Sequence, residues 1–276
     1  MGKLKVIKTG PAASIQDFGR FGVRRYGIPQ SGAMDIDMMI LANRVLGNKE
    51  DFPVIEFAMM GSKMEALEES TVSVVGAESV LNGKKMSNGS FLMMPGDQLE
   101  VSAPTAVYGY IALAGRIQSK IDFESSSTYP PAKFGGINGA SLKAGDILES
   151  KGARRSKREY DHPVIQPKPD LEITIMKGPE WEYLKELPSS KTFVIDSSSN
   201  RMGIRLIGEL QCDYREIKSS AVVPGIIQLP PNGQPIVLMN DCQTTGGYPR
   251  IAKVINEDLG KLAQVKVGHK ISFKTI

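Results

Sequence analysis

The sequence TVSVVGAESVLNGKKMSNGSFLMMPGDQLEV, residues 71–101, alternates short strand-like segments with turns and decides the fold class. Asn82-Gly83 is a typical two-residue hairpin turn between strands. Pro95-Gly96-Asp97 marks a second turn before the next polar-apolar alternation. We therefore predict consecutive antiparallel strands, because short β segments separated by such turns build barrels or sandwiches.

The same pattern extends to both sides of this stretch. VIEFAM (54–59), VYGYIALAG (107–115) and DILE (146–149) are strand-like, and KLKVIK (3–8) is a strand that ends at a Gly-Pro pair. DIDMMILANRVL (35–46) is the clearest helix, with Asp35 as its N-cap and Gly47 following its end. The first half of the chain is therefore expected to be mainly β with few helices.

Composition indicates a globular protein without a metal centre. The chain has 276 residues, is 41% hydrophobic and carries a net charge of +4. No apolar run approaches the roughly 20 residues of a membrane span, and the N-terminus lacks a secretory signal, so a cytoplasmic protein is expected. The chain contains two cysteines and two histidines, with no zinc-ligand spacing and no His-based catalytic triad.

A basic, proline-rich stretch at 151–170 is expected to link a β unit at 1–150 to a second at 171–276. Its block KGARRSKR (151–158) lacks interleaved aromatic residues, so a solvated linker is favoured over a nucleic-acid or membrane contact. His162 lies in this linker.

Three pairs of segments, in the same order in both halves, indicate an internal duplication. They are KLKVIKTGP (3–11) with EITIMKGP (172–179), RFGVRRYG (20–27) with RMGIRLIG (201–208), and LKAGDIL (142–148) with VKVGHKI (265–271). Chance alignment of glycine-rich turns is the alternative. A duplicated barrel would offer a ligand site in the cleft between its units.

Two polar, glycine-rich stretches are candidate walls of such a cleft. SIQDFGRFGVRRYGIPQSGAMD (14–35) combines four glycines with charged and amide side chains, and NGQPIVLMNDCQTTGGYPR (232–250) delivers polar residues from a buried strand to a loop. Well-capped structural loops are the alternative for both.

Several motifs resemble the allophanate hydrolase subunit 2 family, which includes KipA, bacterial 5-oxoprolinase C subunits and part of urea carboxylase. They are SxQDxGRxG (14–22), GIPxSGAMD (27–35), LANR (41–44) and QTTGGYP (243–249). The resemblance covers the chain from about Val6 to Phe273. It implies two pseudo-duplicated cyclophilin-like β-barrel units with a few short helices.

The resemblance also implies partners and a reaction class. The expected partner is an allophanate hydrolase subunit 1 or KipI-like protein, with a third lactam-utilisation-type subunit and a small amide substrate. The leading interpretation is a subunit of an ATP-dependent 5-oxoprolinase. The alternatives are a biotin-dependent urea or amide carboxyltransferase component and a non-enzymatic antagonist of a kinase inhibitor. No P-loop or biotinyl motif is present, so ATP would bind an uncommon or shared site and biotin would come from another protein.

Opening an amide with ATP needs cations for phosphate, donors for an oxyanion and a base. Arg20, Arg25 and Arg201 are the predicted cations, and the backbone amides around Ser31-Gly32 are predicted anion ligands. Asp17 and Asp241 are the predicted catalytic carboxylates. The remaining predicted substrate contacts are Gln16, Ser31, Gln243, Thr244, Thr245 and Tyr248.

The chain departs from the family pattern at two arginines. The usual SRST and DRQTT motifs read SSST (125–128) and DCQTT (241–245), so Ser126 and Cys242 replace arginines. Guanidinium binds anions through paired hydrogen bonds that other side chains do not copy. This predicts either a less anionic substrate or a divergent, regulatory protein.

Overall fold

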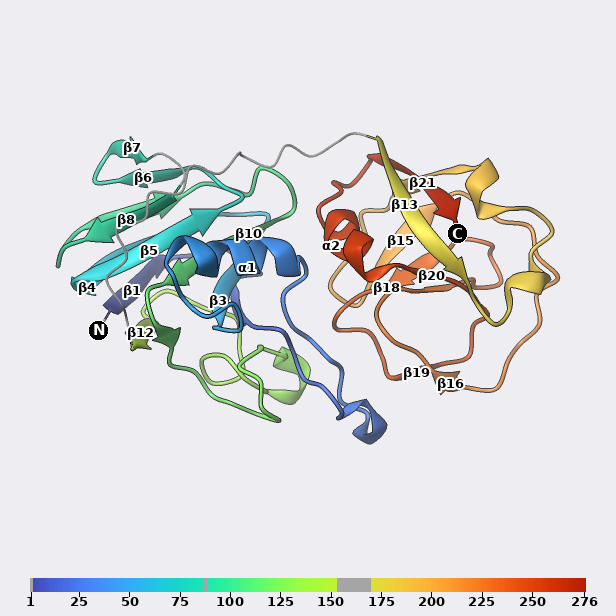
Figure 1. Cartoon of the computed structure of the whole chain (residues 1–276), viewed down its shortest axis with the longest axis horizontal. Helices are drawn as coiled ribbons and strands as arrows, with labels where there is room; N and C mark the ends of the chain where they lie inside the picture. The colour runs from blue at the N-terminus through green and yellow to red at the C-terminus, as the bar shows by residue number, and fades with distance from the viewer. Residues whose placement is uncertain (1, 87–88, 153–169) are drawn as a thin grey trace. The chain divides into compact units, whose positions relative to one another are not determined.

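The computed structural model of the chain describes residues 2–86, 89–152 and 170–276 (Figure 1). They form two compact units, the first made of Met1–Arg20 with Ser31–Gln166 and the second of Phe21–Gln30 with Pro167–Ile276. The predicted linker falls almost wholly outside the described residues, as does His162. Residues 21–30, which the sequence places with the first half, belong to the second unit.

The first unit contains the N-terminal strands and the helix α1. Its elements are β1 (Gly2–Lys8), β2 (Ser14–Gln16), α1 (Ile36–Val45), β3 (Val54–Ala58), β4 (Ser62–Glu68), β5 (Ser70–Val75), β6 (Ser79–Leu81), β7 (Lys84–Met86), β8 (Gly89–Met93), β9 (Gln98–Val101), β10 (Tyr108–Leu113), β11 (Arg116–Ile117), the 3-10 turn η2 (Pro130–Ala132) and β12 (Ile147–Lys151).

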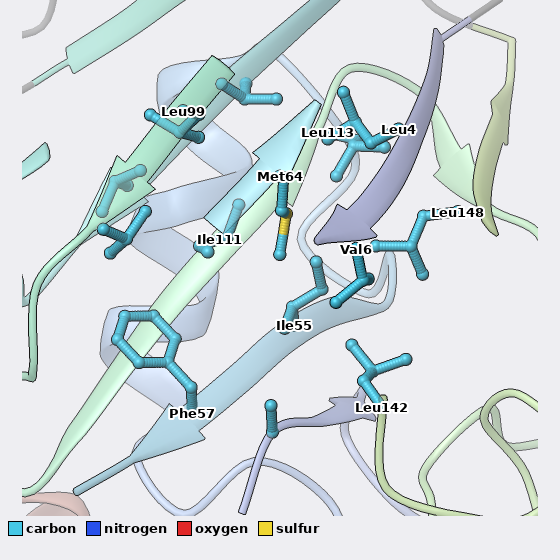
Figure 2. Close-up of a cluster of buried hydrophobic side chains, with 14 of the residues drawn as sticks. Leu4, Val6, Ile55, Phe57, Met64, Leu99, Ile111, Leu113, Leu142 and Leu148 are labelled. Atoms are coloured by element: carbon cyan, nitrogen blue, oxygen red, sulfur yellow. The ribbon is translucent and has the colours of Figure 1, made fainter. Parts of the chain in front are cut away.

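The described strands of this unit form two sheets, in the orders β11-β12-β1-β4-β9-β6-β7 and β2-β3-β10-β5-β8. Apolar side chains from both sheets meet in one buried cluster, which includes Leu4, Met64, Ile55 and Ile111 (Figure 2). Alternation along each strand sends every second side chain into this cluster. The core of the first unit therefore lies between two facing sheets.

Helix α1 covers the outer side of the second sheet, against β5 and β10 (Figure 1). Asp35 is its N-cap, accepting a hydrogen bond from the Met38 N–H at 3.2 Å. Gly47 follows its end with φ of 68°. The predicted helix and both of its ends are thus confirmed.

The two predicted turns are also confirmed. Asn82 and Gly83 have φ of 50° and 80° and join β6 to β7. Left-handed backbone at both central positions is the hairpin geometry that an Asn-Gly pair favours. Gly96, with φ of 89°, lies in the turn between β8 and β9.

The second unit contains the later strands and the helix α2. Its elements are η1 (Arg24–Tyr26), β13 (Asp170–Lys177), η3 (Trp181–Tyr183), η4 (Pro188–Ser190), β14 (Thr192–Ile195), β15 (Gly203–Ile207), β16 (Ser220–Ala221), β17 (Ile226–Gln228), β18 (Ile236–Leu238), β19 (Thr245–Gly246), β20 (Arg250–Val254), α2 (Asn256–Ala263) and β21 (Lys270–Thr275).

Its main strands close into a barrel in the order β13-β20-β17-β18-β15-β14-β21. The ring is completed by parallel pairing of β13 with β21, which lie side by side in Figure 1. Ile204, Val237 and Ile227 are paired across adjacent strands and point into the buried interior. The mainly β fold with a closed barrel is therefore confirmed, while the strands of the first unit are arranged as two sheets.

The structure repeats the predicted duplication only in part. In the first pair both segments are strands, β1 and β13, and each is followed by a Gly-Pro pair. Residues 20–27 form a loop with a 3-10 turn, whereas 201–208 contain strand β15, so that correspondence is wrong. The third pair does place a turn before a strand in each half. However, β12 pairs with β1 antiparallel, and β21 pairs with β13 parallel.

Among the residues described, no helix combines the length and the apolar character needed to cross a bilayer.

Candidate functional site

Asp17 holds a buried polar network in the first unit. It directly follows β2, and its carboxylate accepts hydrogen bonds from the Ser125 and Ser127 hydroxyls at 2.6 Å, the Ser126 N–H at 2.6 Å and the Gly19 N–H at 2.9 Å. Multiple donors of this kind stabilise an ionised carboxylate. Asp17 thus joins the loop after β2 to the SSST segment more than 100 residues later.

Three side-chain oxygens in the segments bonded to this network lie buried with no hydrogen-bond partner in the described part of the chain. They are Gln16 Oε1, Ser31 Oγ and Ser126 Oγ. Gln16 uses its amide nitrogen to reach Ser14 Oγ at 2.9 Å and the Thr128 carbonyl at 3.2 Å. Buried polar atoms are normally paired, so bound water or a polar ligand would be favoured here.

Arg20 is turned inward rather than toward solvent. It is 1% exposed, donates to the Ser127 carbonyl, and its guanidinium lies 5.4 Å from the centre of the Phe134 ring. Its charge therefore acts inside the first unit. This placement differs from the expectation that Arg20 is a main residue for anion recognition.

The backbone amides before α1 are largely used within the protein. Ala33 N–H donates to the Asp17 carbonyl, Met34 N–H to Glu56 Oε2 at 2.7 Å and Asp35 N–H to Tyr110 Oη at 2.8 Å. Tyr110 in turn donates to Glu56 at 2.9 Å, and burial raises the pKa of its hydroxyl well above the ordinary value. These bonds position the helix start and use the backbone amides that directly follow the predicted Ser31-Gly32 anion site.

Arg201 and Asp241 form a paired contact at one end of the barrel in the second unit. Arg201 Nε and Nη2 donate to the two carboxylate oxygens of Asp241 at 2.7 and 3.2 Å, and the Asp241 N–H donates to the Arg201 carbonyl. Both side chains are mostly buried. The predicted base and the predicted cation thus neutralise each other in this structure.

Arg24, which is not among the predicted site residues, connects loop 21–30 to the rest of the second unit. Its Nη2 donates to the carbonyls of Gln243 at 2.6 Å and Val222 at 2.7 Å, and lies 3.6 Å from Cys242 Sγ. Arg25, predicted in its place, is exposed and stacks on Tyr26. Arg24 and Arg25 are neighbours in one loop, but their side chains point in different directions. No local sequence pattern predicts which of the two points inward.

Two adjacent hollows open on the outside of the barrel. One, of about 180 Å³, is lined by residues that include Asn200, Gln228, Gln243 and Tyr248. The other, of about 490 Å³, is lined by Pro230, Asn232 and Gln234 among others. Both share Arg205, Ile236 and Tyr248. These hollows bring together two of the predicted substrate residues, Gln243 and Tyr248.

An amide chain borders the smaller hollow. Gln243 Nε2 donates to Gln228 Oε1 at 3.1 Å, and Gln228 Nε2 donates to the Tyr248 carbonyl at 3.3 Å. Thr244 and Thr245 lie beside it in the β16–β19 pairing, where the Thr244 carbonyl accepts from Val222 N–H and Thr245 is exposed. The later polar stretch is therefore held by Arg24, Val222 and Gln228.

The predicted site residues fall into two groups. Gln16, Asp17, Arg20 and Ser31 belong to the first unit, and the group in the second unit comprises Arg25, Arg201, Asp241, Gln243, Thr244, Thr245 and Tyr248. A shared cleft between them stays a prediction. Within the described ranges, no group of three or more His, Cys, Asp or Glu side chains is placed to hold a metal ion.

Residues 26–275 match the family described as the carboxyltransferase domain, subdomain A and B. This chain is a member of the carboxyltransferase domain family. The resemblance to the allophanate hydrolase subunit 2 family is thereby confirmed, since relatives named as 5-oxoprolinase C subunits match nearly all of the chain.

The relative from Haemophilus influenzae is 37% identical over 99% of this chain and 91% of its own length. The one from Escherichia coli is 36% identical over 98% of this chain and 90% of its length. Urea amidolyase from Saccharomyces cerevisiae is 28% identical over 98% of this chain, which matches 16% of that longer protein.

Solved structures show the same fold. The crystal structure of TTHA0988 superposes with a TM-score of 0.89 at 29% identity over 99% of this chain, which spans 56% of that chain. Urea amidolyase from K. lactis superposes with a TM-score of 0.90 at 26% identity, again over 99% of this chain but 19% of that one. The carboxyltransferase domain therefore occurs both as a separate protein and as part of a longer chain.

The two positions at which the resemblance predicts arginines lie inside the protein. Ser126 and Cys242 are both fully buried. Cys242 packs with Val222 and Leu238, and burial raises the pKa of its thiol while the neighbouring Arg24 lowers it. An arginine at this position would have to fit a buried, largely apolar environment that already contacts Arg24.

Proposed function

We propose that this chain is the C-type subunit of a 5-oxoprolinase, a complex that uses ATP to open the lactam of 5-oxoproline to glutamate. The observation that carries the proposal is the identity of 36–37% with two 5-oxoprolinase C subunits over nearly the full length of all three chains. These relatives match both units of this chain in the same order. Such a match supports a shared role better than a shared fold alone does.

The reaction must overcome amide resonance, which makes the lactam carbonyl a poor electrophile. Phosphorylation of the amide oxygen by ATP would provide a leaving group. ADP leaves at this step. A first water adds its oxygen to the former carbonyl carbon, the C–N bond breaks and the ring nitrogen takes up protons, which leaves an acyl phosphate. A second water then displaces phosphate and gives glutamate. Such a path needs donors aimed at the developing charge and positioned cations.

The described site supplies part of this requirement. The amides of Gln243 and Gln228 and the ring of Tyr248 border a hollow small enough to select a compact ligand, since pockets for drug-sized ligands measure roughly 300–1,000 Å³ against about 180 Å³ here. Asp17 and Asp241 stay the proposed carboxylates, each already engaged by neighbours. ATP is proposed to bind where partner subunits contribute, because this sequence has no nucleotide-binding motif.

The test is reconstitution with candidate partners of the subunit 1 type and the lactam-utilisation type. ATP-dependent release of glutamate from 5-oxoproline is expected with all subunits present and is expected to stop when this chain is omitted. Equal turnover without the chain would refute a role in catalysis. A complex that assembles yet shows no turnover with 5-oxoproline would refute the proposed substrate.

A carboxyltransferase acting on urea or a related amide is the second candidate. It is favoured by the superposition on K. lactis urea carboxylase, with a TM-score of 0.90 at 26% identity. That reaction would require a biotinylated partner, so addition of avidin separates the candidates. Avidin would abolish a biotin-dependent transfer and would leave lactam opening unchanged.

A further inference from the structure

A row of three residues crosses the outside of the barrel beneath the hollows. Arg205 of β15 is paired with Ile236 of β18, and Ile236 is paired with Gln228 of β17. Register partners on neighbouring strands direct their side chains to the same face. Their interior neighbours Ile204, Val237 and Ile227 form the matching row inside the barrel, so the outer row is fixed by the pairing itself.

The row presents a cation, an apolar surface and an amide in that order. Adjacent strands are about 4.7–4.9 Å apart, so the backbones of Arg205 and Gln228 are about 10 Å apart with Ile236 midway. Arg205 and Ile236 line both hollows, and Gln228 lines the smaller one. A shorter ligand with an anionic group at one end and an amide at the other would be held between the side chains that Arg205 and Gln228 extend from these strands.

The charge of Arg205 is available to such a ligand. Its side chain is exposed and forms no salt bridge within hydrogen-bonding distance among the described residues, although its charge contributes to lowering the pKa of the Asp196 carboxyl. Asp196, which also lines the larger hollow, is the acidic neighbour. Its carboxylate already accepts from the N–H and hydroxyl of Ser198, and the pKa of that carboxyl is lowered mainly by these bonds.

The side-chain amide of Gln243 is also available to such a ligand. Gln243 donates one of its two side-chain N–H groups to Gln228, which leaves its other N–H and its oxygen without a partner in the described structure. A lactam is held in the cis form by its ring and therefore presents N–H and C=O side by side. The carboxamide of Gln243 can accept from the first and donate to the second.

We infer that Arg205, Ile236 and Gln243 form the subsite for a small lactam that carries a carboxylate. Arg205 binds the carboxylate through paired hydrogen bonds, Ile236 contacts the ring methylenes, and Gln243, held by Gln228, binds the lactam amide. This inference rests on the proposed function for the identity of the substrate. Arg205 is not among the residues predicted from sequence, although a charged residue between the buried Ile204 and Leu206 indicates an outward position.

The first test is the KM of the reconstituted complex for 5-oxoproline. Arg205→Met should raise KM by about tenfold to a hundredfold, the range expected for losing a hydrogen-bonded ion pair, with a much smaller effect on kcat. Arg205→Lys should recover part of the loss. Arg215→Met removes the same charge from an exposed position on the same unit and should leave KM unchanged.

An unchanged KM in Arg205→Met, or an equal rise in Arg215→Met, would overturn the subsite and leave the proposed function standing. The second test needs no turnover. In the isotope-labelled full chain, 5-oxoproline should shift the side-chain NMR signals of Arg205, Gln228 and Gln243 in a saturable manner.

Two analogues of 5-oxoproline test the lactam and the carboxylate separately. 2-Pyrrolidone should shift only the glutamine signals, and cyclopentanecarboxylate only the arginine signal. If 5-oxoproline shifts none of these signals, the subsite is refuted. If they shift as expected in a chain whose complex does not turn over 5-oxoproline, the subsite stands and the proposed function falls.

Discussion

Arg24 donates a hydrogen bond to the carbonyl of Gln243 at 2.6 Å, although 219 positions separate the two residues in sequence. The same nitrogen also donates to the Val222 carbonyl. One guanidinium therefore fixes both sides of the loop that carries Gln243. The position of the amide that faces the hollow depends on a residue from the N-terminal part of the chain.

Replacing Arg24 with Met should loosen this loop. Two charge-assisted hydrogen bonds would be lost, and two buried carbonyls would lose a donor. We expect the KM of the reconstituted complex for 5-oxoproline to rise about tenfold and the free energy of unfolding to fall by about 2–3 kcal/mol. Arg25→Met, on the same loop but exposed, is the control. If Arg24→Met and Arg25→Met change KM and stability equally, loop 21–30 acts only through its charge.

Replacing Asp17 with Asn should destabilise the first unit. Asparagine cannot accept from four donors, so at least one serine or backbone N–H would lose its partner. We expect a loss of about 3 kcal/mol in unfolding free energy, or about 6–12 °C in Tm, measured by calorimetry. Asp51→Asn, at an exposed turn, should change little.

The same variant tests the predicted catalytic role of Asp17. General base catalysis contributes about 10²–10⁴-fold. A fall in kcat of that size, measured where Asp17→Asn is still folded, would support catalysis. If kcat falls only in proportion to the fraction of protein that is folded, Asp17 has a structural role and no catalytic one.

Replacing Cys242 with the arginine of the family motif should lower the stability of the protein. The side chain is fully buried against Val222 and Leu238, and a guanidinium there would meet Arg24. We expect Cys242→Arg to lose about 3 kcal/mol or more in denaturant unfolding. The double variant with Arg24→Met should recover part of this loss. A fully stable single variant would mean that the loop can open to accept the arginine.

Glu180 should contribute a pH-dependent part of the stability. Arg250 donates to both carboxylate oxygens, at 2.8 and 3.0 Å, and these bonds lower the pKa of Glu180 below its ordinary value of 4.5. The contribution is therefore present above the unfolded pKa and is lost as the pH falls through the folded pKa. Urea unfolding of wild type and Glu180→Gln should converge as the pH falls below about 4.5. Glu182→Gln, at an exposed position, should show the wild-type pH dependence, and parallel profiles for all three would contradict the expectation.

The sequence predicted the features that depend on neighbouring residues. The N-cap at Asp35, the Asn82-Gly83 turn and the strand at 3–8 follow from local preferences that the tertiary structure did not override. The mainly β class follows from many such segments together. The closing of the barrel required the parallel β13–β21 pair, whose partners are about 100 residues apart, and no local pattern specifies that pairing.

The site could be predicted only in part for the same reason. Polar, glycine-rich stretches indicated where Gln243 and Tyr248 lie, because loops at strand ends often carry function. The direction of each charged side chain was not predictable. Arg20 is inside, Arg25 is exposed, and the residue that reaches the Gln243 loop is Arg24. The shared pattern of residues 20–27 and 201–208 falls on a loop with a 3-10 turn in one case and on strand β15 in the other.

The assignment of residues 21–30 to the second unit limits how this protein can be divided. The polypeptide passes from the first unit to the second at 20–21 and returns at 30–31. A break in the gene at the basic stretch would give a C-terminal fragment without Arg24 and an N-terminal fragment with an unsupported loop. The N-terminal and C-terminal parts of the chain therefore depend on each other and are inherited together. Recombination at the basic stretch would replace one part and destabilise the other.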